Sequence, residues 1–245
     1  MVSQTPESQR ATPGRNTYTT LAAGPDFRHE LSIKRSRFIT VLRRVEDESA
    51  ARDLVAELRR EFHDARHHCS AFVIGAERGV QRSNDDGEPS GTAGMPMLEA
   101  LLKRQTRPGG TPAGAAADLS DVCAVVVRYF GGILLGAGGL VRAYSESVSS
   151  AVSKAPLVRR ERLSLFQIAL PHAEAGRLEN ELRSAGYTMT GNEYHAVATH
   201  VGLAMPDDAA VIASATARLA SLTAGRYNLA AAGTQWVDTS VSPHR

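Results

Sequence analysis

The sequence has few of the residues that mark specialised classes of protein. Of its 245 residues only two are cysteine (Cys69 and Cys123), one is tryptophan, and 5% are aromatic. Two cysteines cannot build the disulfide framework of a small secreted domain. No hydrophobic run approaches the roughly 18 residues that cross a bilayer, and residues 1–20 resemble neither a secretory signal nor a transit peptide. We therefore expect a cytoplasmic protein that does not contact a membrane.

A strong charge of either sign is also missing. The chain has 28 Lys and Arg against 26 Asp and Glu, a formal net charge of +2, and no segment is a basic block. This balance argues against DNA as a partner and against strong general affinity for nucleic acid. A local basic face is still compatible with the near-neutral total charge. Arg far outnumbers Lys, which is more typical of genomic base-composition bias than of adaptation to phosphate. With 42% hydrophobic and 22% charged residues, the composition is that of a globular protein.

The first part of the chain alternates strand and helix patterns. Residues 1–25 are polar and lack apolar periodicity, which predicts a mobile tail. Residues 47–62 combine apolar spacings of three and four with acids in the first turn and Arg59-Arg60 in the last, which predicts an amphipathic helix. Long loops are expected over 76–94 and 105–117. The other expected elements are strands over 30–33, 37–45, 69–74 and 122–129, with a turn at 34–36, and helices over 95–103 and 140–153.

The last part of the chain predicts a second domain. Pro156 and the polar run 159–162 indicate a boundary between a domain over 26–155 and another over 160–240. Within the second, Gly186 is expected to end a helix and Pro206 to begin one. The expected elements are strand 163–170, helix 172–185, strands 187–194 and 196–205, helix 206–223 and strand 227–237. That order is βαββαβ, the ferredoxin-like arrangement, so the fold class is α+β.

The first segment with chemical potential is Arg66-His67-His68-Cys69. Successive residues of a strand point to opposite faces, so His67 and Cys69 should share a face while His68 points away. Consecutive residues are thus a poor source of three metal ligands, and no zinc motif is present. We expect no metal site; Cys69 should pack inward, and Arg66 and His68 are candidates to line a groove.

The second segment, residues 83–94, is an acidic loop containing Asp85, Asp86 and Glu88. It fails as an EF-hand because the later bidentate Glu is missing. The acids could form a general acid/base pair, and the Asx, Pro and Gly residues alone would make a turn-dense loop. Thr92 is placed to cap the following helix and expose its amides.

The third segment, residues 128–144, runs from a buried strand through a glycine-rich turn into a helix. Such a turn can hold an anion on backbone N–H groups. Neither common phosphate signature is present: Ala137-Gly138 stands where Walker A needs Lys-Ser/Thr, and the dinucleotide spacing also fails. Arg128 and Arg142 flank the turn and are candidates to bind phosphate. Tight packing of a strand–helix corner would explain some of the glycines.

Long motifs make the chain resemble the IMPACT/YigZ family: KRSRFIT (34–40), DARHHCSAFVIG (64–75), NDDGEPSGTAGMPML (84–98) and AVVVRYFGGILLGAGGLVRAY (124–144). The resemblance implies a first domain like the second domain of ribosomal protein S5 and a second like the ferredoxin-like modules of elongation factors. Eukaryotic members are linked to translational control but carry a different partner domain that is absent here, so that binding role does not transfer. The similarity to bacterial members implies an RNA- or ribosome-associated protein, without an assigned catalytic activity and without a cofactor. The binding positions it suggests are Arg66, His67, His68, Asp85, Asp86, Glu88, Thr92, Arg128, Tyr129, Gly131, Gly132, Gly136, Gly138, Gly139, Arg142 and Tyr144.

The preferred hypothesis is a binding protein for RNA or the ribosome that regulates translation. Arg66, Arg128 and Arg142 would contact phosphates, and Tyr129, Phe130 or Tyr144 would stack on a base. The alternative is an enzyme of phosphoryl or acyl transfer, in which the 136–139 turn holds a phosphate and an acid of the 85–88 loop holds Mg²⁺ or acts as base. A protein partner of the translation machinery is the third reading.

Overall fold

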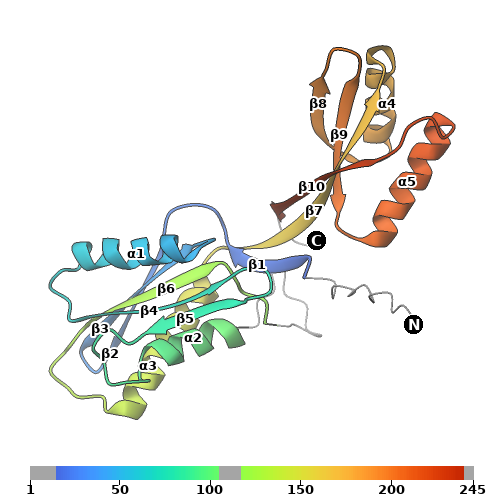
Figure 1. Ribbon diagram of the computed structural model, residues 1–245. Coiled ribbons are helices and arrows are strands. Elements are labelled where there is room, and N and C mark those ends of the chain that lie inside the picture. Colours follow the sequence, from blue (N-terminus) through green and yellow to red (C-terminus); the bar gives the residue numbers. More distant parts are fainter. Residues whose placement is uncertain (1–14, 105–116, 240–245) are drawn as a thin grey trace, which may run out of the picture. The chain divides into compact units, whose positions relative to one another are not determined.

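The computed structural model describes residues 15–104 and 117–239 (Figure 1). The chain forms two compact units that divide between Arg159 and Arg160. Strand β7 (Leu157–Leu170) begins in the first unit and continues in the second. The predictions for residues 1–14 and 105–116 lie outside the described residues. Within the described ranges, no helix has the length and apolarity to cross a membrane.

The first unit is built on a five-stranded sheet, and every pair of neighbouring strands is antiparallel. Helix α1 covers one face of this sheet, and α2 and α3 cover the other (Figure 1). In spatial order the strands are β2 (Phe27–Ile33), β3 (Ser36–Arg44), β6 (Val122–Tyr129), β4 (His67–Ile74) and β5 (Val80–Asn84). The helices are α1 (Glu48–Glu61), α2 (Gly94–Lys103) and α3 (Ala137–Lys154).

The central strand β6 supplies both hydrophobic cores. Its even-numbered Ala124 and Val126 pack with α2 and α3, and its odd-numbered Val125 and Val127 pack with α1. All four side chains are fully buried. The prediction that the continuous apolar run of this strand is buried on both faces is confirmed.

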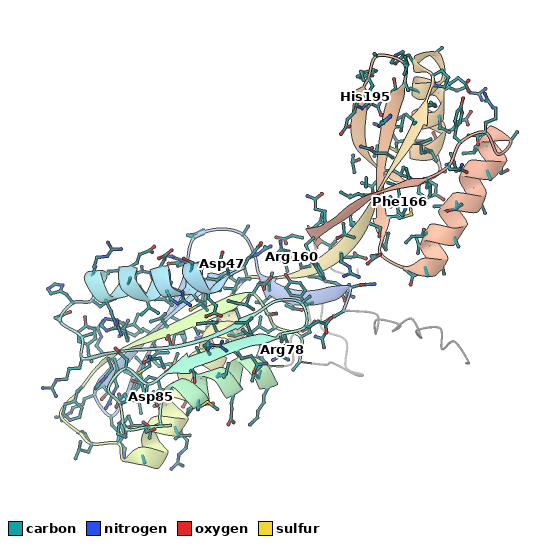
Figure 2. The ribbon with its side chains drawn as sticks, viewed as in Figure 1. Asp47, Arg78, Asp85, Arg160, Phe166 and His195 are labelled. Carbon is teal, nitrogen blue, oxygen red and sulfur yellow. The ribbon has the colours of Figure 1, made fainter. Side chains whose placement is uncertain are left out.

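Helix α1 forms as its sequence pattern predicts. The Asp47 side chain accepts a hydrogen bond from the Ala50 N–H and caps the helix, as its place at the start of α1 in Figure 2 shows. Ala51, Leu54 and Leu58 lie on one face and are buried against the sheet. Spacings of three and four residues on a 3.6-residue turn put these side chains together, so burial of this face holds the helix in place.

Two predictions for the first unit were wrong. Thr17–Leu21, within the expected mobile tail, is strand β1; its last four residues are buried, and Thr19 exchanges backbone hydrogen bonds with Asp118 and Ser120. Strand β5 lies within the expected 76–94 loop and pairs with β4. Both strands are polar in sequence, so tertiary pairing and not apolar alternation defines them.

The second unit has the predicted βαββαβ order and the ferredoxin-like strand order β10-β7-β9-β8. Its core includes Phe166 (Figure 2) and Ile168 of β7. Gly186, with φ +89°, follows α4 as predicted, whereas Pro206 ends β9 and Asp208 caps α5 in its place. The elements after β7 are α4 (His172–Ser184), β8 (Thr188–Tyr194), β9 (Thr199–Pro206), α5 (Ala209–Thr223) and β10 (Ala230–Thr239).

Candidate functional site

The acidic loop after β5 and the glycine-rich loop after β6 meet at one end of the sheet. Between them lies a hollow of about 320 Å³, to which the start of β4 and the start of α3 also contribute. We call this hollow the loop pocket. Its lining residues are Arg66, His67, Glu88, Pro89, Arg128, Phe130, Leu134, Leu135, Gly136, Ala137 and Leu140.

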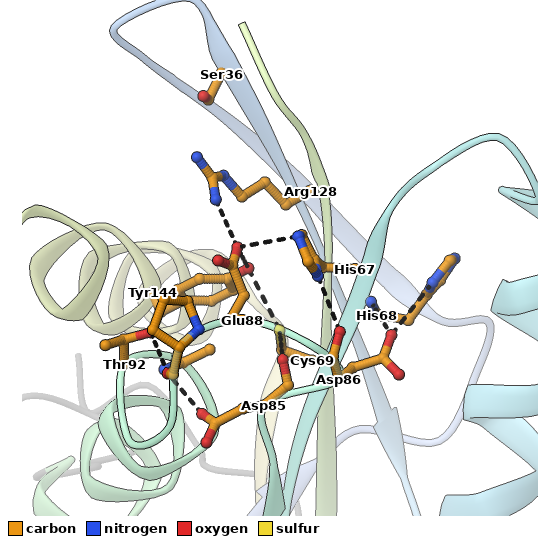
Figure 3. A network of polar contacts seen from close by, with 12 residues as sticks. Ser36, His67, His68, Cys69, Asp85, Asp86, Glu88, Thr92, Arg128 and Tyr144 are labelled. Carbon is orange, nitrogen blue, oxygen red and sulfur yellow. Dashed lines mark hydrogen bonds and ion pairs between the residues drawn. The ribbon is translucent and has the colours of Figure 1, made fainter. Parts of the chain in front are cut away.

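Glu88 lies at the centre of the polar contacts beneath the pocket (Figure 3). Its Oε1 pairs with Arg128 Nη1 at 2.6 Å and accepts a hydrogen bond from the Tyr144 hydroxyl at 2.8 Å. His67 Nε2 lies 3.9 Å from the same oxygen. Glu88 and Arg128 are only 8% and 6% exposed. The carboxylate thus joins β6, α3 and the acidic loop from within the fold.

Arg128 is a buried member of this network and not a free cation. Its guanidinium lies over the Phe38 ring at 5.5 Å and the Phe130 ring at 5.7 Å. Its Nε is buried and has no hydrogen-bond partner among the described residues. The prediction that Arg128 contacts phosphate therefore needs revision, because its ion pair with Glu88 is internal.

The two histidines of β4 point to opposite faces, as their spacing predicts. His67 Nδ1 donates to the Asp86 carbonyl oxygen at 2.9 Å, so its Nε2 is left facing Glu88 and the pocket. His68 lies on the α1 face, where its ring bonds the Phe62 carbonyl oxygen at 3.2 Å. Burial lowers the pKa of His68, which keeps that ring neutral near pH 7.

Asp85, and not Thr92, caps helix α2. Its carboxylate accepts hydrogen bonds from the N–H groups of Gly91, Ala93 and Gly94 at 2.7–3.0 Å. Burial opposes ionisation of Asp85, but these three bonds outweigh it and hold the pKa below its usual value. The Thr92 hydroxyl instead donates to the Pro89 carbonyl at 2.6 Å. Asp85 occupies the Ala93 and Gly94 amides at this helix start, which were expected to be exposed.

The other acids of this loop are engaged as well. Asp86 Oδ2 accepts the His68 backbone N–H at 2.6 Å, and Oδ1 pairs with Arg59. With Asp85 on three amides and Glu88 on Arg128, each carboxylate already has internal partners. The roles of Mg²⁺ ligand or general base that the enzyme alternative gave to these acids therefore do not fit this arrangement.

Cys69 and Tyr144 complete the interior of the network. The Cys69 thiol lies 3.0 Å from the Asp85 carbonyl oxygen and 3.3 Å from the Tyr144 hydroxyl. Burial raises the pKa of Cys69 to about 12, so the thiol is protonated and inert. Tyr144 is fully buried, with its ring edge-on to Phe38 at 5.3 Å. The prediction that Tyr144 stacks on a base is wrong, because nothing outside the fold reaches its ring.

The glycines of the second loop differ in their structural roles. A Cβ at Gly131 would lie 2.0 Å from the backbone carbon of Arg35, so Gly131 is required by the close approach of the β2–β3 turn. Gly132 and Gly136 have φ of +84° and +71°, which favour glycine. Gly138 and Gly139 lie in the first turn of α3; its N-cap residue Gly136 has no side chain to cap that turn, and the Gly139 N–H donates to the Gly136 carbonyl oxygen at 3.1 Å.

Known proteins are similar in sequence to the part of the chain that forms this site. Residues 34–152 match the model of the Impact N-terminal domain. The chain is 43% identical over 166 residues to the IMPACT family member YvyE of Bacillus subtilis, covering 68% of this chain and 70% of that one. It is 37% identical over 201 residues to YigZ of Escherichia coli, covering 81% and 91%. The chain belongs to the IMPACT family.

A solved structure of a hypothetical protein is also similar to this IMPACT chain. It is 34% identical with a TM-score of 0.57, covering 87% of this chain and 96% of the other. The matched Impact N-terminal domain contains the whole loop pocket, since the lining runs from Arg66 to Leu140. The family model therefore covers the polar network and both loops.

The exposed part of the IMPACT site differs from the prediction in its aromatic residues. Tyr129 faces the α1 side, where its hydroxyl bonds Asp64 at 2.7 Å, so it does not reach the pocket. Phe130 does, with 44% of its surface exposed, and Leu134 on the same loop is 83% exposed. Sequence reasoning missed Leu134; the signal was an apolar Ile-Leu-Leu run between glycines, where a turn should be polar.

The two exposed arginines of the predicted set lie near the start of α3. Arg66 lines the loop pocket. Arg142 is exposed, and its Nε donates to the Gly138 carbonyl at 3.2 Å. Among the described residues, one group elsewhere has the chemistry to hold a metal ion: the ligand atoms of Glu193, His195 and His200 lie within 4.8 Å of one another. Sequence reasoning missed this group because its three residues are separated by a turn of the β8–β9 hairpin.

Proposed function

We propose that this protein is a cytoplasmic RNA- or ribosome-associated binding protein that regulates translation, and that the loop pocket receives an unpaired nucleotide. One observation carries the proposal: uncapped helix amides, an exposed arginine and an exposed aromatic ring surround a single hollow. The amides and the arginine would bind the phosphate of a nucleotide, and the aromatic ring would stack on its base.

The phosphate group has two kinds of donor. The 18-residue helix α3 follows Gly136, which has no side chain to cap it; the Gly139 N–H bonds the Gly136 carbonyl oxygen, which leaves the Ala137 and Gly138 N–H groups without a partner among the described residues. Such a helix end favours an anion through its N–H groups and its dipole. Arg66 in the pocket lining and Arg142 on the first turns of α3 add exposed guanidinium groups, which suit bidentate contacts with phosphate.

The base has an apolar surface to meet. Phe130 offers a half-exposed ring at the pocket, and Leu134, Leu135 and Leu140 form an apolar wall. Stacking of a base on an aromatic side chain contributes about 1–3 kcal/mol and tolerates any sequence. Unpaired bases of loops and ends are the usual targets of RNA-binding proteins, so we favour single-stranded over duplex RNA.

Near-neutral net charge sets the expected strength of binding. With a formal charge of +2, the protein lacks the long-range field of a general nucleic-acid binder. Affinity should therefore be modest and should depend on local contacts, with a shallow dependence on salt.

The test uses fluorescence anisotropy with a labelled 12-nucleotide RNA at low salt, together with cosedimentation with ribosomes. Phe130→Ala and the pair Arg66→Gln with Arg142→Gln should each weaken RNA binding without unfolding the protein, because all three side chains are exposed. Arg177→Gln with Arg183→Gln, on α4, is the control of equal charge change. Arg128→Ala is unsuitable, since it would leave Glu88 buried without its partner.

If the wild-type protein retains neither RNA nor ribosomes at low salt, the proposal is wrong. The enzyme alternative has one supporting observation: the volume of the pocket, about 320 Å³, lies within the range of small-molecule sites. Nucleotides with Mg²⁺ that raise the melting temperature in a concentration-dependent way, in the absence of RNA binding, would favour that alternative.

A further inference from the structure

A second and larger hollow lies on the opposite face of the same sheet. It is a groove of about 880 Å³ between helix α1 and the strands β4 and β5. We call it the α1–β5 groove. Its walls include Arg52, Arg59, Arg60 and Arg82, and its floor includes Val55 and Phe72. None of the four arginines belongs to the site predicted from the sequence.

The groove exists because α1 does not cover the whole sheet. The buried face of α1 packs with residues of β3, β6 and β4. Strand β5 is at the edge of the sheet and pairs with β4; its first residue, Val80, packs against this core, whereas Arg82 and Ser83 line the groove. The side chains of α1 and β5 thus face each other across an open channel with an apolar floor.

Charges are segregated on the two sides of α1. On the side away from the groove, Glu57 pairs with Arg43 and Glu61 pairs with Arg28, so the acids of that side are neutralised. On the groove side, the lining has four arginines and one acid, Glu48, and Asp86 pairs with Arg59 from outside the lining. The same helix therefore presents a basic wall to the groove.

The arginines are free to exchange their partners. The side chains of Arg52 and Arg82 are 71% and 62% exposed, and both approach the single carboxylate of Glu48, at 3.0 and 3.9 Å. Exposed ion pairs of this kind contribute little to stability, so a phosphate can replace the carboxylate at small cost. Arg60 bonds only a backbone oxygen of its own helix among the described residues, Ala56 O.

The groove and the loop pocket share one strand end. His67 lines the pocket and His68, the next residue, lines the groove. Asp86 joins the two, because its backbone oxygen accepts from His67 while its carboxylate accepts from the His68 backbone N–H (Figure 3). The same carboxylate pairs with Arg59. A single-stranded RNA with one nucleotide in the loop pocket could therefore continue past the start of β4 into the groove.

We infer that the α1–β5 groove binds the sugar–phosphate backbone of single-stranded RNA and extends the site of the loop pocket. This inference rests on the proposed function. Guanidinium groups on both walls match the phosphates, and the apolar floor of Val55 and Phe72 suits sugars and base faces. The contacts are to the backbone, so the groove adds affinity without sequence preference.

The test compares two triple variants of the full chain by anisotropy. Arg52→Gln, Arg60→Gln and Arg82→Gln remove groove cations and spare Arg59, which holds Asp86. Arg177→Gln, Arg183→Gln and Arg218→Gln make the same change of charge on exposed positions of the second unit. The probes are labelled RNAs of 3 and 12 nucleotides, at several salt concentrations.

The groove variant should bind the 12-nucleotide RNA at least about tenfold more weakly at low salt, and the slope of log affinity against log salt should decrease by about 2. Its affinity for the 3-nucleotide RNA, which the loop pocket alone can hold, should be unchanged. The control should behave as wild type. Circular dichroism and urea unfolding should show both variants folded.

Two other outcomes separate the hypotheses. If the groove variant binds the longer RNA like the control while Phe130→Ala weakens binding, the groove inference is overturned and the proposed function stands. If the wild-type chain binds neither RNA nor ribosomes, the proposed function fails and the groove inference fails with it.

Discussion

The buried ion pair of Glu88 and Arg128 gives a sharp test of how the site is built. The two side chains are 3% and 7% exposed and join at 2.6 Å. Replacing Glu88 by leucine keeps the volume but leaves the guanidinium in a low-dielectric interior without its carboxylate. Breaking a buried pair from one side costs about 3–5 kcal/mol. We therefore expect the free energy of unfolding of the first unit to fall by this amount, and its Tm by roughly 6–20 °C.

A double-mutant cycle separates the lost pairing from altered packing. Arg128→Met should also destabilise, because Glu88 is then buried unpaired. In the double variant both charges are gone, and apolar side chains of similar size take their place. We expect the loss in free energy of unfolding of the double variant to be about 1–3 kcal/mol smaller than the sum of the losses of the two single variants.

The assay can distinguish the two units. Trp236, the single tryptophan of the sequence, lies in the second unit, so its fluorescence follows that unit during urea unfolding. Far-UV circular dichroism follows both units. The Glu88 and Arg128 variants should shift the dichroism transition of the first unit and leave the Trp236 transition in place. Losses under 1 kcal/mol in both single variants, or strict additivity in the double variant, would refute the reasoning.

Three further predictions concern the loops of the site. Asp85→Ala should lower the free energy of unfolding by about 1–2 kcal/mol at neutral pH, since it removes the α2 cap. Because the folded pKa of Asp85 is lowered, the contribution is complete above the unfolded pKa of about 4 and is lost as the pH falls through the folded value. The urea stabilities of wild type and variant should therefore converge as the pH is lowered; a constant gap would contradict the capping role. Gly131→Ala should cost at least about 2 kcal/mol because its Cβ meets the Arg35 backbone. Gly138→Ala, whose Cβ has only Arg142 within 4 Å, should be neutral or stabilising in the same thermal melts.

The fold could be predicted where sequence periodicity reflects burial. The continuous apolar run of β6 and the three-and-four spacing of α1 each correspond to a buried surface, so both elements were predicted. Strands β1 and β5 were not, because their residues are mostly polar and their backbone pairing has no signature in a single sequence. Pairing partners far along the chain define such strands.

The site could be predicted as a set of positions but not as a set of roles. The sequence predicts binding roles for Asp85, Glu88 and Tyr144, but the structure engages all three in contacts within the fold. Carboxylates that could hold a cation or act as a base also satisfy buried amides and guanidinium groups, and a phenol that could stack on a base also packs in a core, so sequence alone does not separate these uses. Arg82 was missed for the opposite reason: an isolated arginine in a polar segment has no signal until β5 and α1 bring it opposite Arg52.

The buried network also determines which experiments can identify a ligand. Arg128 lies between Phe38 and the pocket residue Phe130, so its loss would move the ring that we expect to stack on a base. Glu88 joins that arginine to Tyr144 of α3, so its loss would disturb the helix start that we expect to bind phosphate. Reduced RNA binding by variants of Glu88 or Arg128 would thus report positioning and not contact. Only exposed residues, such as Arg66 and Phe130, can distinguish an RNA contact from the scaffold that supports it, because their removal leaves the hydrogen bonds of Glu88 with Arg128 and Tyr144 in place.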